Sequence, residues 1–251
     1  MLVENMKGVI PAAGKGTRLE PITLAIPKEL LMIGDKAIIE HNINAMKNTG
    51  ITDITIIVGW RKHALLDYLG SGERLGVKLT YVVQDKNDGL GKAILTAEHT
   101  IQKEPFLVIL GDNYFHPPTF IKEIIQHHQE KKAEATIGVT EIEDTRRHGI
   151  IKPGEDTKIT DIIEKPEPKQ APSKIGCIGI YVFNPVIFQA LKKIKPGVNN
   201  EYQLTDAIKK LIEEKHKVYY KKIDGIHIDI GTINDYKKAN NYFFNQQEKH
   251  I

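Results

Sequence analysis

The chain has 251 residues, 41% of them apolar and 27% charged, and its formal net charge is +3. A balance this close to neutral gives no support to nucleic-acid binding, and no apolar stretch approaches the roughly 20 residues of a membrane-spanning helix. The single cysteine, Cys177, excludes an internal disulfide framework and a cysteine-rich zinc site. Because Met1–Met6 contains Glu4 and Asn5, it does not resemble a signal peptide. We expect a cytoplasmic protein with no nucleic-acid or membrane partner.

Apolar runs alternate with amphipathic segments through the first half of the chain. Buried strands are expected at Lys7–Ala12, Ile54–Val58, Leu79–Val83 and Phe106–Leu110. Helices are expected at Ala37–Asn48, Arg61–Leu69, Gly91–Ile101 and from Pro117-Pro118 to about Lys131. This order predicts a parallel sheet with helices on both faces, whose ligands bind beyond the carboxyl ends of the strands. The loops after Ala12 and Leu110 are therefore candidate sites.

The second half is less regular and mixes strands with helices. Its expected strands are Ala135–Glu141, Gly149–Lys152, Ile159–Glu164, Gly176–Phe183, Val218–Ile223 and Ile226–Ile230. Its expected helices are Pro185–Lys193, Glu201–Lys215 and Asn234–Asn245. No linker rich in Gly, Ser or Pro interrupts the chain, so we expect one domain with a nucleotide-binding first half and a substrate-facing second half.

The loop after the first strand combines glycines with cations in Gly14-Lys15-Gly16-Thr17-Arg18, and Lys28 follows ten residues later. Glycines let the backbone approach a ligand closely, and successive N–H groups of such a turn form an anion site. Arg18 adds a planar donor fork for phosphate oxygens, so a polyphosphate is the natural partner. The P-loop spacing is absent, and Leu19 stands where a dinucleotide fingerprint needs its third glycine. A capping turn with exposed cations is the structural alternative.

The whole stretch GKGTRLEPITLAIPKEL, residues 14–30, resembles the signature of sugar-1-phosphate nucleotidyltransferases. In that family, G-x-G-T-R leads to a proline and then to a P-K pair. The resemblance implies a loop that wraps a nucleoside triphosphate, with Arg18 on the pyrophosphate that leaves and Lys28 beside the phosphates. It also implies substrate contacts from Ala13, Gly14, Gly16 and Thr17.

Three further segments resemble the family's nucleotide and metal motifs. Gln84, followed by Asp88-Gly89-Leu90-Gly91, resembles the segment that reads a pyrimidine, and an amide offers both a donor and an acceptor to a base edge. Leu110-Gly111-Asp112-Asn113 follows a buried strand, and Asp229-Ile230-Gly231 matches a late D-x-G segment. Mg²⁺ takes carboxylate and phosphate oxygens together. The resemblance implies Mg²⁺ ligands at Asp112 and Asp229 and substrate contacts from Gln84, Gly89 and Asn113.

The sugar-side motifs follow in the family's order. Arg147-His148-Gly149 resembles its Tyr-Gly-Val position with a histidine in place of the aromatic residue, and Glu164-Lys165-Pro166 matches E-K-P. Cys177-Ile178-Gly179 resembles the next sugar-side strand. The resemblance implies sugar contacts from Gly149, Glu164 and Gly179, and a phosphate contact from Lys165. Glu201–Asp206 resembles E-x-Q-L-T-D, and we expect it to be mainly structural because acidic residues suit a helix N-terminus.

These motifs span residues 8 to about 232. The resemblance implies an α/β fold of the nucleotidyltransferase, GT-A-like type: a Rossmann-like mixed, mostly parallel sheet flanked by helices, with a smaller sugar-binding part. A single domain, 1–251, would hold a nucleotide-binding half at about 6–132. The sugar-binding half and the C-terminal helix would occupy about 133–251.

The implied activity is Mg²⁺-dependent synthesis of a nucleotide sugar and pyrophosphate from UTP or dTTP and a hexose 1-phosphate, with glucose 1-phosphate as the leading sugar. Ala25–Glu29 and Gln203–Asp206 look like uridylyltransferases, whereas Asp88–Gly91 and Gly111–Asn113 look like thymidylyltransferases. UTP is slightly favoured, although a methylene-sized difference discriminates by only about 1–3 kcal/mol, so dual specificity is open.

Two other classes of protein are alternatives. A dinucleotide-binding oxidoreductase should have an acidic residue at the end of its second strand, but that strand ends in Val58-Gly59-Trp60. A non-catalytic nucleotide-sugar sensor should have lost the phosphate cations or metal carboxylates, which this chain retains. A homo-oligomer also remains open.

Overall fold

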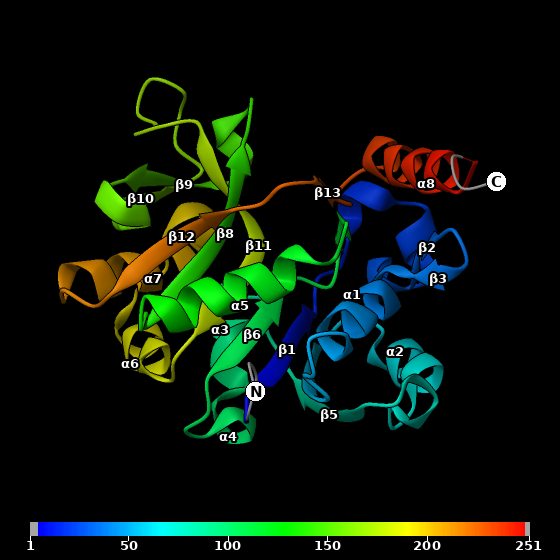
Figure 1. Ribbon diagram of the computed structural model, residues 1–251. Coiled ribbons are helices and arrows are strands. Elements are labelled where there is room, and N and C mark those ends of the chain that lie inside the picture. Colours follow the sequence, from blue (N-terminus) through cyan, green and yellow to red (C-terminus); the bar gives the residue numbers. More distant parts are fainter. Residues whose placement is uncertain (1–4, 249–251) are drawn as a thin grey trace.

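Figure 1 shows the computed structural model of the protein, which describes residues 5–248. The prediction that Met1–Met6 is not part of a signal peptide falls mainly outside these residues. Among the residues described, no helix is both long and apolar enough to cross a bilayer. The fold is an α/β arrangement around a nine-stranded mixed sheet, as the sequence predicts.

The first half of the chain forms the parallel part of the sheet in the order β6-β1-β4-β5. These strands are β1 (Lys7–Ala12), β4 (Asp53–Val58), β5 (Lys78–Val83) and β6 (Phe106–Ile109). Their connecting helices are α1 (Ile38–Lys47), α2 (Lys62–Leu69), α3 (Leu90–Thr96) and α4 (Glu98–Ile101). The predicted helix at Gly91–Ile101 is thus two helices, because the Ala97 N–H bonds to the Ile94 carbonyl and tightens the turn there.

Helices cover both faces of this sheet, as predicted. Neighbouring residues of β1 point to opposite sides, with Val9 in one core and Ile10 in the other. The Ile10 core contains α1, α2 and α5 (Phe120–Glu130), and the Val9 core contains α3, α4, α6 (Val186–Lys193) and α7 (Leu204–Glu213). Burial on both faces explains why the strands read as continuous apolar runs.

The second half extends the sheet mainly with antiparallel pairs. Its strands are β8 (Ala135–Glu141), β9 (Gly149–Pro153), β10 (Ile159–Glu164), β11 (Ile175–Phe183) and β12 (Val218–Lys222). β11 joins the two halves, because it runs antiparallel to β6 on one side and to β8 and β9 on the other. β12 pairs parallel to β8 at the edge.

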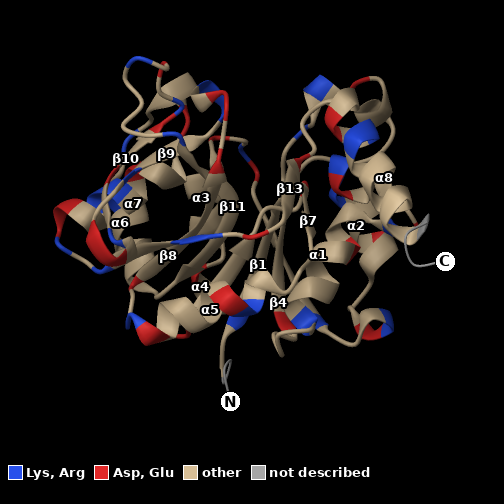
Figure 2. Cartoon of the chain, turned by 45° about the horizontal axis from the view of Figure 1, so that its top comes forward, with Lys and Arg blue, Asp and Glu red and all other residues tan. Residues whose placement is uncertain are grey.

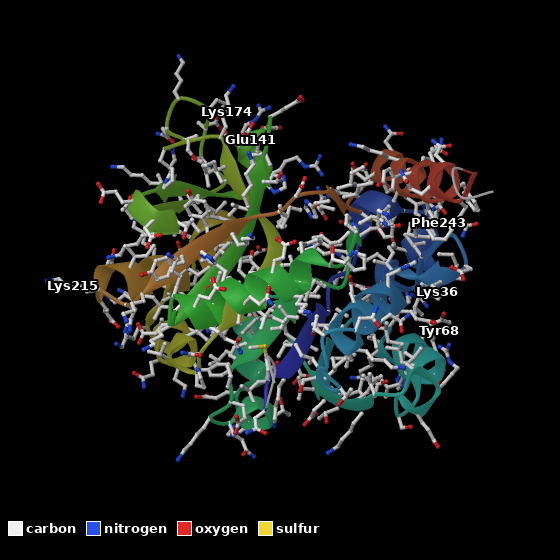
Figure 3. All side chains as sticks on the ribbon, in the orientation of Figure 1. Lys36, Tyr68, Glu141, Lys174, Lys215 and Phe243 are labelled. Atoms are coloured by element: carbon white, nitrogen blue, oxygen red, sulfur yellow. The ribbon has the colours of Figure 1, made fainter. Side chains whose placement is uncertain are left out.

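The C-terminal part of the chain returns to the first half. β13 (Ile226–Asp229) pairs antiparallel with β7 (Asn113–His116), a strand that the sequence did not predict. α8 (Ile233–Glu248) then lies beside β2 (Met32–Ile33) and β3 (Lys36–Ala37), where Figure 1 shows red next to blue. Asn240 accepts a hydrogen bond from the Gly34 N–H and donates one to the Met32 carbonyl, both at 3.1 Å. Figure 3 shows Phe243 on the same side of the molecule as Lys36.

Candidate active site

Two adjoining cavities contain nearly all of the predicted site residues. The smaller, of about 200 Å³, lies at the loop after β1 and is here called the loop cavity. The larger, of about 530 Å³, lies toward β9, β10 and β11 and is here called the strand cavity. Asp112 lines both, so the two spaces meet at this carboxylate. Figure 2 looks onto this region, with β11 and β13 between the β9–β10 hairpin and α8.

The structure divides the predicted residues between the cavities as follows. The loop cavity is lined by Ala13, Gly14, Lys28, Gln84 and Gly89. The strand cavity is lined by Arg18, Asn113, Gly149, Glu164, Lys165, Gly179 and Asp229. Gly16 and Thr17 line neither cavity. A separate space of about 370 Å³ between α1, β7 and α8 is lined by none of the predicted residues.

The phosphate loop (Gly14–Arg18) is shaped by its own sequence. Gly16 has a φ of +66°, a left-handed conformation that favours glycine, and its carbonyl accepts a hydrogen bond from Thr23 Oγ1 at 2.8 Å. A Cβ added at Gly14 would lie 3.5 Å from Lys28 Nζ, so the second cation reaches back to the first glycine. Arg18 lies against Gly231, where a Cβ would come within 2.8 Å of Nη2. Lys28 and Arg18 both act to lower the pKa of Asp229, so the two predicted cations lie around one carboxylate.

Lys28 and Asp112 form a hydrogen-bonded ion pair where the cavities meet. Burial alone would lower the pKa of Lys28, but Asp112, Glu29 and Asp229 outweigh it and raise the pKa above its ordinary value. Asp229 approaches Asp112 because β7 and β13 pair Asn113 with Asp229, and the Ile230 N–H donates to the Asp112 carbonyl at 3.0 Å. Burial and Asp112 raise the pKa of Asp229. Such a pair of carboxylates favours a bound cation.

Glycine and a short network fix the polar wall of the strand cavity. Gly179 has a φ of +75°, and a Cβ there would overlap the Asn113 amide, which donates to the Ile178 carbonyl at 3.0 Å. On β10, Glu164 accepts a hydrogen bond from Thr205 Oγ1 at 2.8 Å. The Lys165 ammonium lies 3.4 Å from Glu164 Oε1. A carboxylate and an amide that are oriented in this way suit hydroxyl groups, and the adjacent ammonium suits an anion.

Gln84 is held at the wall of the loop cavity by the glycine segment that follows it. Its side-chain amide donates to Asp88 Oδ1 and to the Gly89 carbonyl, both at 3.2 Å. Tyr202 fastens this segment, because its N–H donates to the Asp88 carbonyl and its carbonyl accepts from the Gly91 N–H, both at 2.8 Å. The part of the loop cavity that would contact a base is therefore hydrogen-bonded to the chain segment before α7.

Several residues that line the cavities are not among the predicted site residues. Within residues 5–248, the buried side-chain atoms without a hydrogen-bond partner are Glu29 Oε2 and His227 Nε2, and both residues line a cavity. Burial raises the pKa of Glu29 to about 7 against the opposing effect of Lys28. Arg147 Nη2 lies 3.8 Å from Asp229 Oδ2 and 3.6 Å from Asp235 Oδ2.

The segment before α7 also lines the candidate site. Glu201 lines both cavities, and Gln203 and Thr205 line the strand cavity, so the segment borders the candidate site as well as leading into α7. α7 itself begins only at Leu204. Glu29, Arg147 and Glu201 all lie inside motifs noted in the sequence, which is the signal that could have found them.

The chain belongs to the nucleotidyl transferase family, whose model matches residues 7–246. It is 36% identical over 253 residues to the UTP–glucose-1-phosphate uridylyltransferase of Staphylococcus epidermidis, covering 90% of this chain and 87% of the relative. It is 32% identical over 236 residues to the low-salt glycan biosynthesis nucleotidyltransferase Agl11 of Haloferax volcanii, covering 94% of this chain and 65% of Agl11.

A solved structure of a UDP-glucose pyrophosphorylase complexed with UDP-glucose has the same fold as this chain. The TM-score is 0.89 at 33% sequence identity, over 96% of this chain and 99% of the solved one. The predicted fold class and the family resemblance are therefore both confirmed.

Proposed function

We propose that this protein transfers a uridylyl group from UTP to glucose 1-phosphate, making UDP-glucose and pyrophosphate. The observation that carries the proposal is the junction of the two cavities at Asp112, with Lys28, Arg18 and Asp229 around it. A cavity with a phosphate loop and a cavity with hydroxyl-binding side chains would place two anionic substrates end to end. The similarity to a UTP–glucose-1-phosphate uridylyltransferase and to a UDP-glucose pyrophosphorylase complexed with UDP-glucose supports UTP and glucose 1-phosphate as substrates. dTTP is the alternative nucleotide.

The proposed reaction is an in-line displacement at the α-phosphorus. A phosphate oxygen of the sugar phosphate forms the new P–O bond while the bond to the β-phosphate breaks, and pyrophosphate leaves with that electron pair. No protein nucleophile is needed, so positioning and electrostatic stabilisation supply the catalysis. Lys165 would aim the sugar phosphate, Lys28 would neutralise charge at the α-phosphate, and Arg18 would stabilise the leaving pyrophosphate.

We also propose that Asp112 and Asp229 hold Mg²⁺. Within the described residues no cluster of three or more His, Cys, Asp or Glu side chains could hold a metal ion. Two carboxylates that are completed by substrate phosphates fit the way Mg²⁺ binds in such sites, and the raised pKa of Asp229 marks a place where a cation is favoured. When bound, the ion would offset charge on the phosphates. Lys28 would then leave Asp112 for a phosphate oxygen.

The test is pyrophosphate release from the purified protein with Mg²⁺ and glucose 1-phosphate, comparing UTP, dTTP, ATP, GTP and CTP. Release with UTP would support the proposal, and release with dTTP alone would support the thymidylyltransferase. Release only with a purine nucleotide would refute the role of Gln84 at the base. No release with any nucleotide or hexose phosphate, together with tight binding of a nucleotide sugar, would support the sensor instead.

Location and assembly are smaller parts of the proposal. Substrates of this kind and a single buried cysteine favour the cytoplasm. A homo-oligomer is tested by light scattering of the purified chain.

A further inference from the structure

The loop that follows β4 touches the phosphate loop, although it lines neither cavity. β1 and β4 are parallel neighbours in register at Ala12 and Val58, so the chain leaves both strands at the same edge of the sheet. Gly59 packs against Ala13, and a Cβ on Gly59 would lie 2.9 Å from the Ala13 carbonyl oxygen. The Trp60 N–H donates to this oxygen at 3.5 Å. Trp60 is therefore fixed beside the phosphate loop.

Two cationic side chains lie near the Trp60 ring. Lys15 Nζ lies 5.9 Å and Arg61 Cζ 5.3 Å from the ring centroid, both within the range of a cation–π interaction. Trp60 is 39% exposed, so it is not a core residue. Arg61 also donates a hydrogen bond from Nη2 to the carbonyl of Leu24, in the segment that follows the phosphate loop. Trp60 thus contacts Lys15 of the phosphate loop, and Arg61 contacts Leu24 in the segment that follows the loop.

The cations of this cluster have no acidic partner in the described chain. Within residues 5–248, no Asp or Glu oxygen lies within 4.0 Å of a side-chain nitrogen of Lys15, Arg18 or Arg61. Lys28, by contrast, pairs with Asp112. Like charges around one backbone loop repel one another until an anion neutralises them. The arrangement fits an anion of more than one phosphate that extends from the loop toward Trp60.

We propose that Lys15 and Arg61 bind the terminal phosphates of the nucleoside triphosphate and the departing pyrophosphate. In this proposal, Trp60 positions the side chains of Lys15 and Arg61. The identity of this anion rests on the proposed function. Contact with the flat indole restricts two long side chains before the anion arrives, so less rotamer freedom is lost on binding. Arg18 would hold the inner end of the pyrophosphate and the Trp60 cluster its outer end.

Trp60 supplies its own probe, because it is the single tryptophan of the chain. Titration of the full chain with inorganic pyrophosphate in EDTA should change its fluorescence saturably. Lys15→Met and Arg61→Met should each weaken pyrophosphate affinity by about tenfold. Lys62→Met is the matched control, because it removes a neighbouring charge that forms no cation–π pair in the described residues. Its affinity should stay within about twofold of wild type.

Trp60→Ala is measured in the reverse reaction, with pyrophosphate and nucleotide sugar as substrates. The KM for pyrophosphate should rise by about 3- to 10-fold while the KM for the nucleotide sugar stays unchanged, and Trp60→Phe should restore most of the loss. Equal effects of Trp60→Ala on both constants would overturn the positioning role. Lys15→Met and Arg61→Met binding pyrophosphate as tightly as Lys62→Met would overturn the site.

Pyrophosphate binding needs neither base nor sugar, so the two proposals fail separately. A saturable fluorescence change that is lost in Lys15→Met and Arg61→Met, in a protein that makes no nucleotide sugar, would refute the enzyme and keep the anion site. Normal nucleotide-sugar synthesis with no effect of either variant on pyrophosphate affinity would refute the anion site alone.

Discussion

Lys28 and Asp112, 84 residues apart in the sequence, form an ion pair in which each side chain is only 17% exposed. The sequence assigned them to different partners, a phosphate and a metal ion. In the protein without ligands each neutralises the other, so neither charge is left alone in a partly buried place. If metal and nucleotide bind as proposed, they exchange this pair for two new ones.

Lys28→Met should lower kcat/KM for the nucleotide by about 10²- to 10³-fold, because it removes charge stabilisation at the α-phosphate. The same change should tighten Mn²⁺ binding to the nucleotide-free protein, since Lys28 no longer competes for Asp112. Isothermal titration with Mn²⁺ measures the second effect. Lys36→Met, which breaks the remote pair with Asp35, is the control. Unchanged Mn²⁺ affinity in Lys28→Met would contradict the exchange.

Asp112→Asn should weaken activity and also change its dependence on Mg²⁺, because one of two proposed ligands is lost. We expect at least about a 10²-fold loss of kcat, only partly recovered at high Mg²⁺. The measurement is the Mg²⁺ concentration at half-maximal rate. If Mg²⁺ stimulates wild type and variant over the same range, the assignment of Asp112 to the metal is wrong.

Arg18→Ala should separate catalysis from folding. Arg18 is exposed, and its guanidinium forms no ion pair within residues 5–248, so thermal stability should change little. Loss of a donor to the leaving pyrophosphate should lower turnover by about 10²- to 10³-fold. Steady-state kinetics and a melting curve on the same sample decide the matter, and near-normal turnover would remove Arg18 from the mechanism.

Local pattern was enough to predict much of the fold. The bounds of β1, β8 and β10 match the predicted strands, because β1 is mainly apolar and β8 and β10 are rich in β-branched Ile, Val and Thr. In α5, the buried face is the predicted set Phe120, Ile121, Ile124, Ile125 and His128. Helical periodicity within one segment carries that information, and no distant contact is needed to read it.

Features that depend on distant partners could not be predicted in this way. β7 is a strand only because it pairs with β13, more than a hundred residues later, and its sequence Asn-Tyr-Phe-His has no strong alternation of its own. The return of α8 to β2 likewise depends on the complementary amide contacts of Asn240. In the site, the family motifs were enough to assign Lys28, Asp112 and Asp229 to one place. The same motifs contain Glu29, but nothing in the local sequence shows that its carboxyl is buried.

Glu29 should make the nucleotide-free protein less stable as the pH rises. Its pKa is raised by burial to about 7 from an ordinary 4.5, so the folded chain retains a proton that the unfolded chain releases in this window. The free energy of unfolding should therefore fall by about 2–3 kcal/mol between about pH 5 and pH 8. Glu29→Gln cannot titrate and should lack this loss. Urea unfolding at both pH values, with exposed Glu130→Gln as control, measures the difference; parallel behaviour of Glu29→Gln and wild type would contradict it.

His128 should act in the opposite direction and far from the site. It is buried between α5 and β8, with Nδ1 3.0 Å from Thr136 Oγ1 and Nε2 3.4 Å from Asn184 Oδ1. Burial lowers the pKa of His128 to about 4 from 6.5. Between pH 6.5 and about pH 4, His128 binds a proton in the unfolded chain but not in the folded chain. The free energy of unfolding therefore decreases as the pH falls. The loss should be about 2 kcal/mol between pH 7 and about pH 5.

His128→Gln removes the titration, and it should be less stable than wild type at pH 7 because the packing and hydrogen bonds of the imidazole are lost. As the pH falls to about 5, the gap between the two proteins should close by about 2 kcal/mol. Urea unfolding at the two pH values measures this gap, and His63→Gln, at an exposed position on α2, controls for removal of a histidine. A gap that is the same at both values would show that His128 takes up its proton equally in the folded and unfolded chain, and would contradict the effect of its burial.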